Sequence, residues 1–363
     1  MSLLDKIRAN QSNRKAPILT GSHIFNSFIN SVDDGYCVLT AESKAGKTTL
    51  MNWLFILSIV EKDIDVDIQW VYYSFEINKL KMQAKFISYF MYKTWGERVS
   101  ANYVMGNEVD QETKQRKIIS AVHWQMIEEV YDTWIVPLFG GRDKSGAYHK
   151  GKIIFFEGKE NPTGIYNFMK QLLSQHGKIH EQEVEVLNEL KEIKTVKVFD
   201  YYEKKTDTQI VLLIDHPRKL KKERGFSMKE NLDKIDEYLS ELYKDYFVFC
   251  VSISHSNRGV TDVERIKHAK DKLFITPEDV KDSGNAPESC SIFMSIFSPR
   301  DKKYNIASHF NKMDGTPKLI KNESAKRYRT LHIPFLRDGE GDKHMCYYLD
   351  GLVGDIIEIE ELQ

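Results

Sequence analysis

The sequence predicts an α/β protein whose central sheet is mostly parallel and flanked by helices. Three observations carry this prediction. Short apolar runs alternate with longer amphipathic stretches, a Gly-Lys-Thr triplet separates one run from the helix that follows it, and the C-terminal part changes to short runs joined by polar turns. With 363 residues, 41% apolar and 29% charged, the chain can bury a sizeable core, which excludes a disordered protein.

Five apolar runs are the expected strands of the parallel part. Runs that are apolar throughout are typical of strands covered on both faces, and their alternation with helical patterns indicates βαβ units. The runs are Tyr36–Thr40, Gln69–Phe75, Lys152–Phe156, Gln209–Ile214 and Phe247–Ser254. The helical patterns span residues 47–60, 78–94, 163–176 and 229–244.

The C-terminal part is expected to extend this sheet with antiparallel strands. Turns rich in glycine, aspartate and lysine separate its short runs, and such turns favour hairpins over helical crossovers. The runs are Ser291–Phe297, Tyr304–Phe310, Arg327–Phe335 and Met345–Leu349.

We interpret the chain as one large domain, residues 17–363, preceded by an arm. Residues 1–16 are polar and basic with a weak amphipathic pattern, and we expect either a linker helix that packs on a neighbouring subunit or a frayed terminus. Residues 95–150 interrupt the strand–helix rhythm with a helix-like segment (Gln115–Thr133) and a glycine-rich turn region. We expect these residues to form an insertion on the single domain.

Charge and cysteine content exclude several classes of protein. Lys and Arg total 52 against 53 Asp and Glu, a net charge of −1, which excludes a globally basic nucleic-acid binder but not a locally basic face. The four cysteines are widely separated, without zinc-ligand spacing, so we expect buried reduced thiols. No secretory leader and no run of about 20 apolar residues is present, which predicts a cytoplasmic protein without a membrane partner.

The strongest local motif is a phosphate loop that follows the first strand and opens a helix. This context matches a Walker A motif, in which backbone N–H groups cradle phosphate oxygens. The residues expected to bind nucleotide are Ala41, Ser43, Lys44, Ala45, Gly46, Lys47, Thr48 and Thr49. Lys47 would charge-pair with the β- and γ-phosphates, and the Thr48 hydroxyl would bind Mg²⁺. Ala41 stands where the motif begins with glycine, and a chance Gly-Lys-Thr triplet is the alternative.

Polar residues follow three further strands and the last long run. Glu76 could orient a water for attack on the γ-phosphate, although a helix-capping surface glutamate is the alternative. Asp215 follows four or more apolar residues, the Walker B pattern of a carboxylate that holds Mg²⁺. His255 could contact the γ-phosphate, or be an ordinary loop histidine. Arg337 could reach a neighbour's nucleotide, or lie in a simple hairpin.

A basic run directly after the Walker B strand is a candidate nucleic-acid contact. Loops that follow strand carboxyl ends face the ligand side of such sheets, and single-strand binding needs cations along the phosphate path. The candidate residues are Arg218, Lys219, Lys221 and Lys222. A solvated charged surface is the alternative.

These motifs, in this order, resemble the RecA-like ATPase domain of DnaB-type replicative helicases from about Leu19 to Leu349. The phosphate loop and residues 74–77 look like the opening blocks of that family, and residues 213–216 like its Walker B strand. Residues 254–258 resemble its sensor block, residues 280–284 its channel-lining block, and residues 337–339 its arginine-finger block.

The resemblance implies a RecA-like P-loop core, ATP and Mg²⁺ as ligands, and a homo-oligomeric ring, expected to be a hexamer, around single-stranded DNA. It implies catalytic roles for Lys47, Glu76, His255 and Arg337, metal binding by Thr48 and Asp215, and DNA contacts by three residues of the channel-lining block. Those three are Lys281, Asp282 and Gly284. The histidine at position 255 favours a phage-encoded member of the family. Such a protein would act in the cytoplasm of a bacterial host. Phe335 stands where the family often has lysine.

The resulting hypothesis is an ATP-hydrolysing motor that translocates on single-stranded DNA as a replicative helicase. Because only about sixteen residues precede the domain, we expect the primase-docking collar of this family to be absent or to be supplied by another chain, with a primase or loader as a possible separate chain. The first alternative is a RecA-superfamily ATPase that does not unwind DNA, such as a recombinase, a loader or a regulatory switch. The second is a nucleotide-binding scaffold with degraded catalysis.

Overall fold

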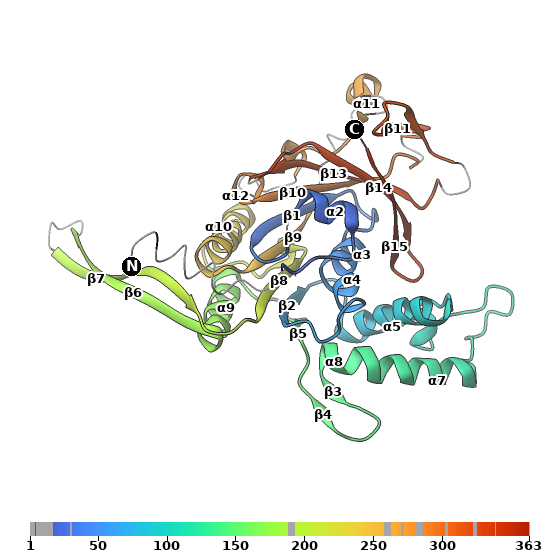
Figure 1. Cartoon of the computed structure of the whole chain (residues 1–363), viewed down its shortest axis with the longest axis horizontal. Coiled ribbons are helices and arrows are strands. Elements are labelled where there is room, and N and C mark those ends of the chain that lie inside the picture. Colours follow the sequence, from blue (N-terminus) through green and yellow to red (C-terminus); the bar gives the residue numbers. More distant parts are fainter. Residues whose placement is uncertain are drawn as a thin grey trace.

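A nine-stranded sheet forms the centre of the molecule in the computed structural model (Figure 1). The structure describes Leu4 and residues 17–29, 31–187, 193–257, 263–269, 272–280, 286–301, 304–321, 325–337 and 339–362. In spatial order the strands are β15 (Asp355–Leu362), β14 (Lys343–Asp350), β13 (Tyr328–Leu336), β10 (Ile292–Phe297), β1 (Gly35–Ala41), β9 (Phe249–His255), β8 (Gln209–Asp215), β2 (Ile68–Ser74) and β5 (Ile153–Phe156).

Six neighbouring strands, from β10 to β5, are parallel, and β13, β14 and β15 continue the sheet antiparallel. The prediction of a mostly parallel sheet with antiparallel C-terminal strands is therefore confirmed. β9 lies between β1 and β8, so the phosphate-loop strand and the Walker B strand are second neighbours. The carboxyl ends of β1, β9, β8 and β2 meet at one edge of the sheet.

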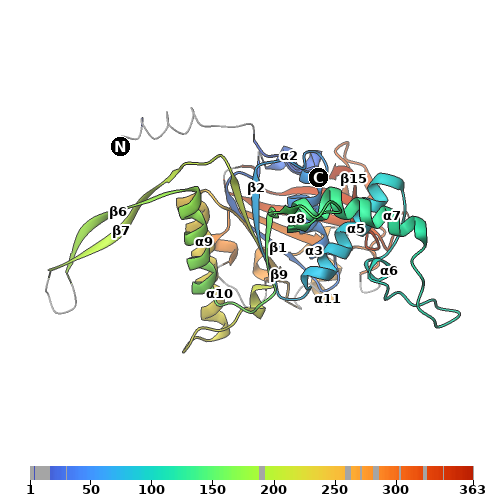
Figure 2. The ribbon, with the colours of Figure 1, turned by 90° about the horizontal axis from the view of Figure 1, so that it is seen from below.

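Helices cover both faces of the sheet, which explains why its central strands are apolar throughout. Along β1, Cys37 and Leu39 join one apolar core while Tyr36 and Val38 join the other. Figure 2 shows α9 and α10 on one side of the strands and α3 and α5 on the other. Each face therefore has its own core.

The helices on the α3 side begin directly after the phosphate loop. They are α3 (Lys47–Asn52), the π-helical turn η1 (Trp53–Leu57), α4 (Ser58–Val60), α5 (Lys79–Trp95), α6 (Ala101–Val104), α7 (Ala121–Val130), the π-helical turn η2 (Tyr131–Ile135) and α8 (Val136–Phe139). The other face carries α9 (Pro162–His176), α10 (Met228–Tyr246) and α12 (Ala286–Ser289). The remaining helical segments are α2 (His23–Phe28), α11 (Val263–Ala269) and the 3₁₀ turns η3 (Pro217–Lys219) and η6 (Pro277–Asp279).

Residues 95–150 pack onto the domain through their helical part. Trp134 of η2 stacks on Phe90 of α5 with ring centroids 4.2 Å apart, and Ile127 and Val130 of α7 join the core on that face. The glycine-rich turn region forms a small hairpin, β3 (Gly141–Arg142) with β4 (Tyr148–His149).

The C-terminal runs differ from the prediction in two places. The run Ser291–Phe297 forms β10, which pairs parallel with β1 and antiparallel only with β13. The run Tyr304–Phe310 does not enter the main sheet, because turn hydrogen bonds from Tyr304 and Ile306 curl its first half. Its end forms β11 (Ser308–Asn311), which pairs with β12 (Pro317–Leu319) in a separate two-stranded sheet. The sequence analysis did not predict β15.

A long antiparallel hairpin, β6 (Gly177–Leu187) with β7 (Ile193–Lys204), extends away from the body of the molecule in both views (Figures 1 and 2). Val184 pairs with Val196 on one face, whereas Glu183 pairs with Lys197 on the other. The sequence analysis did not predict this hairpin, although its β6 half alternates apolar and acidic residues.

The cysteine prediction is confirmed, because Cys37, Cys250, Cys290 and Cys346 are all buried and unpaired. In the part of the chain that the structure describes, no helix is both long and apolar enough to cross a bilayer. Apart from Leu4, the predicted arm, residues 1–16, lies outside the described residues.

Candidate nucleotide site at the strand carboxyl ends

The loop between β1 and α3 turns sharply through two left-handed residues, Lys44 (φ 66°) and Gly46 (φ 104°). The φ angle favours glycine there, and a Cβ at position 46 would stand 2.4 Å from Leu349 Cδ2, so that side chain would have to shift. Ala41 is the last residue of β1 and has extended backbone, so the motif tolerates alanine at that position. The loop thus has the tight backbone of a phosphate cradle without its first glycine.

Lys47 lies folded against the loop that precedes it. Its Nζ donates to the carbonyl oxygens of Ala41 at 2.8 Å and Glu42 at 2.9 Å, and lies 3.2 Å from His255 Nδ1. Burial lowers the pKa of Lys47 to about 8, while the charge of Asp215 acts in the opposite sense. An ammonium only donates, so Nδ1 of His255 accepts and this imidazole is neutral. Burial, followed by the charge of Lys47, lowers the pKa of His255 to about 4.

Thr48 and Asp215 form a pair of oxygen donors. The Thr48 hydroxyl donates to Asp215 Oδ2 at 3.0 Å, and Asp215 is fully buried at the end of β8. Burial raises the pKa of Asp215 to about 6. Among the described residues, Asp215 Oδ1 has no hydrogen-bond partner. A buried carboxylate oxygen without a donor beside a threonine hydroxyl fits Mg²⁺, which prefers such hard oxygen ligands.

Glu76 lies on the loop after β2 and is held by two basic side chains. Lys219 Nζ donates to Oε1 at 2.7 Å, and His216 Nε2 lies 3.2 Å from Oε2. Burial opposes ionisation of Glu76, but the bond from Lys219 and the nearby imidazole together hold its pKa below the usual range. The carboxylate is therefore ionised and able to accept a proton.

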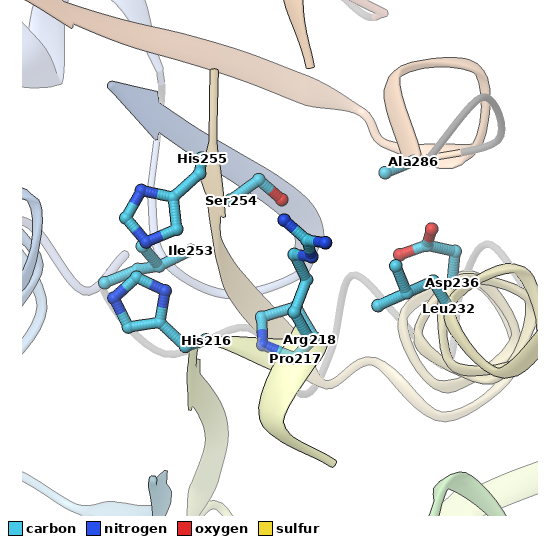
Figure 3. A pocket seen from close by; sticks show the side chains of 9 residues that line it. All are labelled: His216, Pro217, Arg218, Leu232, Asp236, Ile253, Ser254, His255 and Ala286. Atoms are coloured by element: carbon cyan, nitrogen blue, oxygen red, sulfur yellow. The ribbon is translucent and has the colours of Figure 1, made fainter. Parts of the chain in front are cut away.

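His216 connects these groups, and the sequence analysis assigned it no role. It follows Asp215 with left-handed backbone (φ 68°), which turns its ring back over the strand ends. Its Nε2 also lies 3.6 Å from Asp215 Oδ1, and its ring stacks on that of His255 at 4.3 Å (Figure 3). Burial lowers its pKa to about 4. We call Glu76, His216 and His255 the strand-end cluster.

A pocket opens beside the two stacked histidines (Figure 3). Asp236 on its far side accepts a 2.6 Å hydrogen bond from the Tyr36 hydroxyl, which ties α10 to β1. The lining residues are His216, Pro217, Arg218, Leu232, Asp236, Ile253, Ser254, His255 and Ala286.

The antiparallel part of the sheet supports the phosphate loop from behind. Arg329 on β13 donates from Nε to the Ala45 carbonyl at 3.1 Å, and Leu349 on β14 packs against Gly46. The sequence analysis missed both residues, because no local pattern marks a contact that joins segments almost three hundred residues apart.

The candidate DNA residues have different environments. Lys219 is paired with Glu76, whereas Lys221 and Lys222 are exposed on the loop beyond η3 and Arg218 is half-buried beside the pocket. Lys281, Asp282 and Gly284 lie outside the described residues. The segment that leads to them runs beside the end of β9, where Val280 forms a bridge with Ser256.

Arg337 lies at the other edge of the sheet. Its backbone N–H donates to the Ser291 carbonyl, and Leu336 pairs with Ile292, at the amino end of β10. Because β10 runs parallel to β1, this is the edge opposite the phosphate loop. Its guanidinium is exposed and donates to the Glu288 carbonyl at 2.9 Å. Arg337 therefore does not contribute to the site of its own chain.

A mostly parallel sheet with a phosphate loop after β1 and acidic residues at the carboxyl ends of β8 and β2 defines the RecA-like P-loop fold. The structure is similar to one described as that of a DnaB-like replicative helicase and its interactions with primase. The TM-score is 0.62 at 13% identity, over 99% of this chain and 68% of that chain. It is also similar to the ATPase domain of a phage DnaB-like protein, with a TM-score of 0.61 at 13% identity, over 98% of this chain and 97% of that chain.

These similarities establish the fold, and they confirm the predicted likeness to DnaB-type helicases at the level of structure. No protein-family model and no curated protein matches the sequence.

Proposed function

We propose that this chain is an ATP-hydrolysing motor that forms a ring, translocates on single-stranded DNA and acts as a replicative helicase. The observation that carries the proposal is the convergence of Lys47, Thr48, Glu76, Asp215 and His255 at the carboxyl ends of four adjacent strands. The similarity to helicase structures favours this function over other uses of the fold.

The loop from Ala41 to Thr49 would hold the triphosphate of ATP. Lys47 would exchange its bonds with the Ala41 and Glu42 carbonyls for phosphate oxygens, which are stronger partners for an ammonium. Thr48 and Asp215 would hold Mg²⁺, which when bound neutralises charge on the phosphates.

Glu76 would orient and deprotonate the attacking water. Its ionised state, which lets the carboxylate accept a hydrogen bond from water, and its position one strand away from Asp215 support this role. His216 and Lys219 would hold the carboxylate in place. His255, already in contact with Lys47, would report the presence of the γ-phosphate to β9.

Arg337 would act on the nucleotide of an adjacent copy. Its exposure and its position at the edge opposite the phosphate loop of its own chain support this role. The site would then be complete only in an oligomer, in agreement with the expected hexameric ring. Such a ring would act in the cytoplasm, in a bacterial host if the protein is phage-encoded.

DNA contact would fall to Lys221, Lys222 and Arg218 after β8, together with Lys281, Asp282 and Gly284. Lys219 would serve both roles, since it lies on the same loop but binds Glu76.

ATPase activity measured with and without oligo-dT tests the proposal. We expect stimulation by oligo-dT, and we expect Glu76→Gln to reduce turnover by about 10²–10⁴-fold while ATP still binds. Glu128→Gln, an exposed carboxylate on α7, is the matched control and should leave turnover unchanged. An ATPase rate that oligo-dT does not change, together with no DNA binding at low salt, would refute the proposed motor function.

A strand-displacement assay separates the helicase from the alternative RecA-superfamily ATPase. A helicase releases the labelled strand of a forked duplex when ATP is present. A recombinase, loader or switch hydrolyses ATP without doing so.

A further inference from the structure

The turn between β13 and β14 holds a second cluster of ligating side chains, far along the sheet from the strand-end cluster. His332 on β13 and His344 on β14 are directly paired across the two strands, and Asp342 lies just before β14. The two imidazole rings stack almost parallel, at 4.1 Å and 13°, so one ring must turn about its side-chain bonds for both Nε2 lone pairs to point at one ion. We call these three residues the turn cluster.

The three ligand atoms form a small triangle. His332 Nε2 lies 3.1 Å from Asp342 Oδ1, and His344 Nε2 lies 3.7 Å from the same oxygen. All three atoms lie within 4.8 Å of one another. A tetrahedral ion with bonds of about 2.0–2.2 Å to nitrogen and oxygen places its ligands roughly 3.3–3.6 Å apart. The two measured distances bracket this range.

The buried nitrogens of the cluster are under-satisfied. Among the described residues, neither nitrogen of His344 has a hydrogen-bond partner, and His332 Nδ1 also has none, although both side chains are at least nine-tenths buried. A buried imidazole without partners costs free energy. A cation bound beside Asp342 would give His344 Nε2 the partner that the protein does not supply.

Aromatic rings pack against the cluster, and Lys272 and His309 are titratable side chains near it. The ring of Phe274 lies 3.8 Å from that of His332, and the ring of Phe310 lies 3.9 Å from that of His344. Such a shell fixes the rings and excludes water on one side, while the exposed Asp342 leaves the other side open to solvent. The exposed Lys272 is a nearby positive charge that opposes a cation, and the Asp342 carboxylate lies closer to the ligand atoms.

The geometry points to a binding site for a divalent transition ion of the zinc type, formed by His332 Nε2, His344 Nε2 and an oxygen of Asp342, with solvent as the further ligand. The ion would close the β13–β14 turn, which also carries Arg337. This site is independent of the proposed function, since it contains none of the nucleotide residues.

Cobalt(II) tests the site directly, because tetrahedral Co²⁺ in a zinc site has characteristic visible absorption. The metal-stripped full-length protein is titrated with Co²⁺ and the ion is then displaced with Zn²⁺. We expect one equivalent of Co²⁺ that Zn²⁺ displaces. Asp342→Ala and His344→Phe should each lower the affinity for Co²⁺ by more than the roughly 10–100-fold that is lost when a residue hydrogen-bonded to a metal ligand is removed.

The variants are chosen to keep the fold. Asp342 is exposed, and a phenylalanine at position 344 keeps an aromatic ring against Phe310; circular dichroism checks both. Two controls should retain the equivalent: His149→Phe, which removes an exposed histidine–aspartate pair, and Glu76→Gln, which alters the strand-end cluster.

Three results would overturn the inference. Wild-type protein could bind no Co²⁺, the folded Asp342→Ala and His344→Phe variants could bind as tightly as wild type, or the equivalent could be lost with Glu76→Gln. None of these results bears on whether the protein hydrolyses ATP.

Discussion

The strand-end cluster and the turn cluster have similar compositions and different surroundings. Each contains two stacked histidines beside a carboxylate. Lys47 and Lys219 contact the first, whereas the rings of Phe274 and Phe310 enclose the second. Ammonium groups favour an anion such as a phosphate, and an apolar shell around imidazoles and a carboxylate favours a cation. The neighbours of a histidine cluster, more than its own residues, indicate what it binds.

The largest expected effect tests whether the strand-end cluster needs a second subunit. Arg337→Ala should reduce ATP turnover by ~10³-fold or more, as loss of an arginine that stabilises phosphoryl transfer does. Lys47→Ala should also be inactive, because it removes the phosphate-binding ammonium. Phosphate release is measured for each variant and for their mixture.

The mixture gives the decisive result. If active sites are shared, mixed assemblies contain some sites with an intact phosphate loop from one variant and an intact arginine from the other, and activity partly returns. No recovery in assemblies shown to be mixed would assign Arg337 to a structural role.

The second prediction concerns acid, which should act on the histidines of both clusters in the same direction, because burial also lowers the pKa of His216 and of His255 to about 4. Burial lowers the pKa of His332 to about 4 and that of His344 to about 3, so the unfolded chain binds more protons below about pH 6.5. Stability should therefore fall as the pH drops from about 6.5 towards 4. Asp215 acts in the opposite direction, because its pKa of about 6 makes stability fall as the pH rises from about 4 to 6.

His344→Phe should reduce the loss of unfolding free energy between about pH 6.5 and pH 4 by on the order of 3 kcal/mol. Urea unfolding in the presence of a chelator measures this loss. His268→Phe is the control and should keep the wild-type slope, since His268 is exposed on α11. Equal slopes in wild type and His344→Phe would show that His344 is protonated in the folded protein.

The third prediction concerns His216 as a positioning residue for Glu76. His216→Ala should lower kcat by up to ~10²-fold with little change in KM, because the carboxylate loses one of its two partners. His216→Gln should restore part of kcat, since its amide donates in place of Nε2. A change in KM alone, or no rescue by glutamine, would contradict the positioning role.

The smallest expected effect concerns the exposed lysines after β8. Lys221→Glu/Lys222→Glu should weaken oligo-dT binding and reduce the salt slope of log K by about 1.4, which is two contacts at about 0.7 each. Lys114→Glu/Arg116→Glu is the matched control, with the same charge change on the exposed surface of residues 95–150. Fluorescence anisotropy at several salt concentrations measures both. If wild type and the Lys221/Lys222 variant have equal salt slopes, Lys221 and Lys222 do not contact DNA and are part of a solvated charged surface.

Much of the fold was predictable because it follows from local patterns. The apolar runs mark the central strands, and the carboxyl ends of parallel strands meet at one edge. Glu76, Asp215 and His255 could therefore be expected together before any contact was known. The Lys44 and Gly46 turn follows from the phosphate-loop motif in the same way.

The remaining features depend on tertiary register. The pairing of His332 with His344 requires the alignment of β13 and β14, and the ring of His216 reaches Glu76 only because its backbone is left-handed. Arg329 meets Ala45 across 284 positions of sequence. The β6–β7 hairpin is a different case, since its period-two alternation was present in the sequence and was not used.

The placement of Arg337 and the phosphate loop at opposite edges of one sheet limits how copies can associate. In an isologous pair, each molecule offers the other the same patch, and one patch cannot contain both edges. Copies that share active sites must therefore stack front to back, each supplying its arginine in the same direction. A row of copies joined in this head-to-tail way leaves no unpaired interface only when it closes into a ring. All copies in the row point the same way, so the assembly is polar.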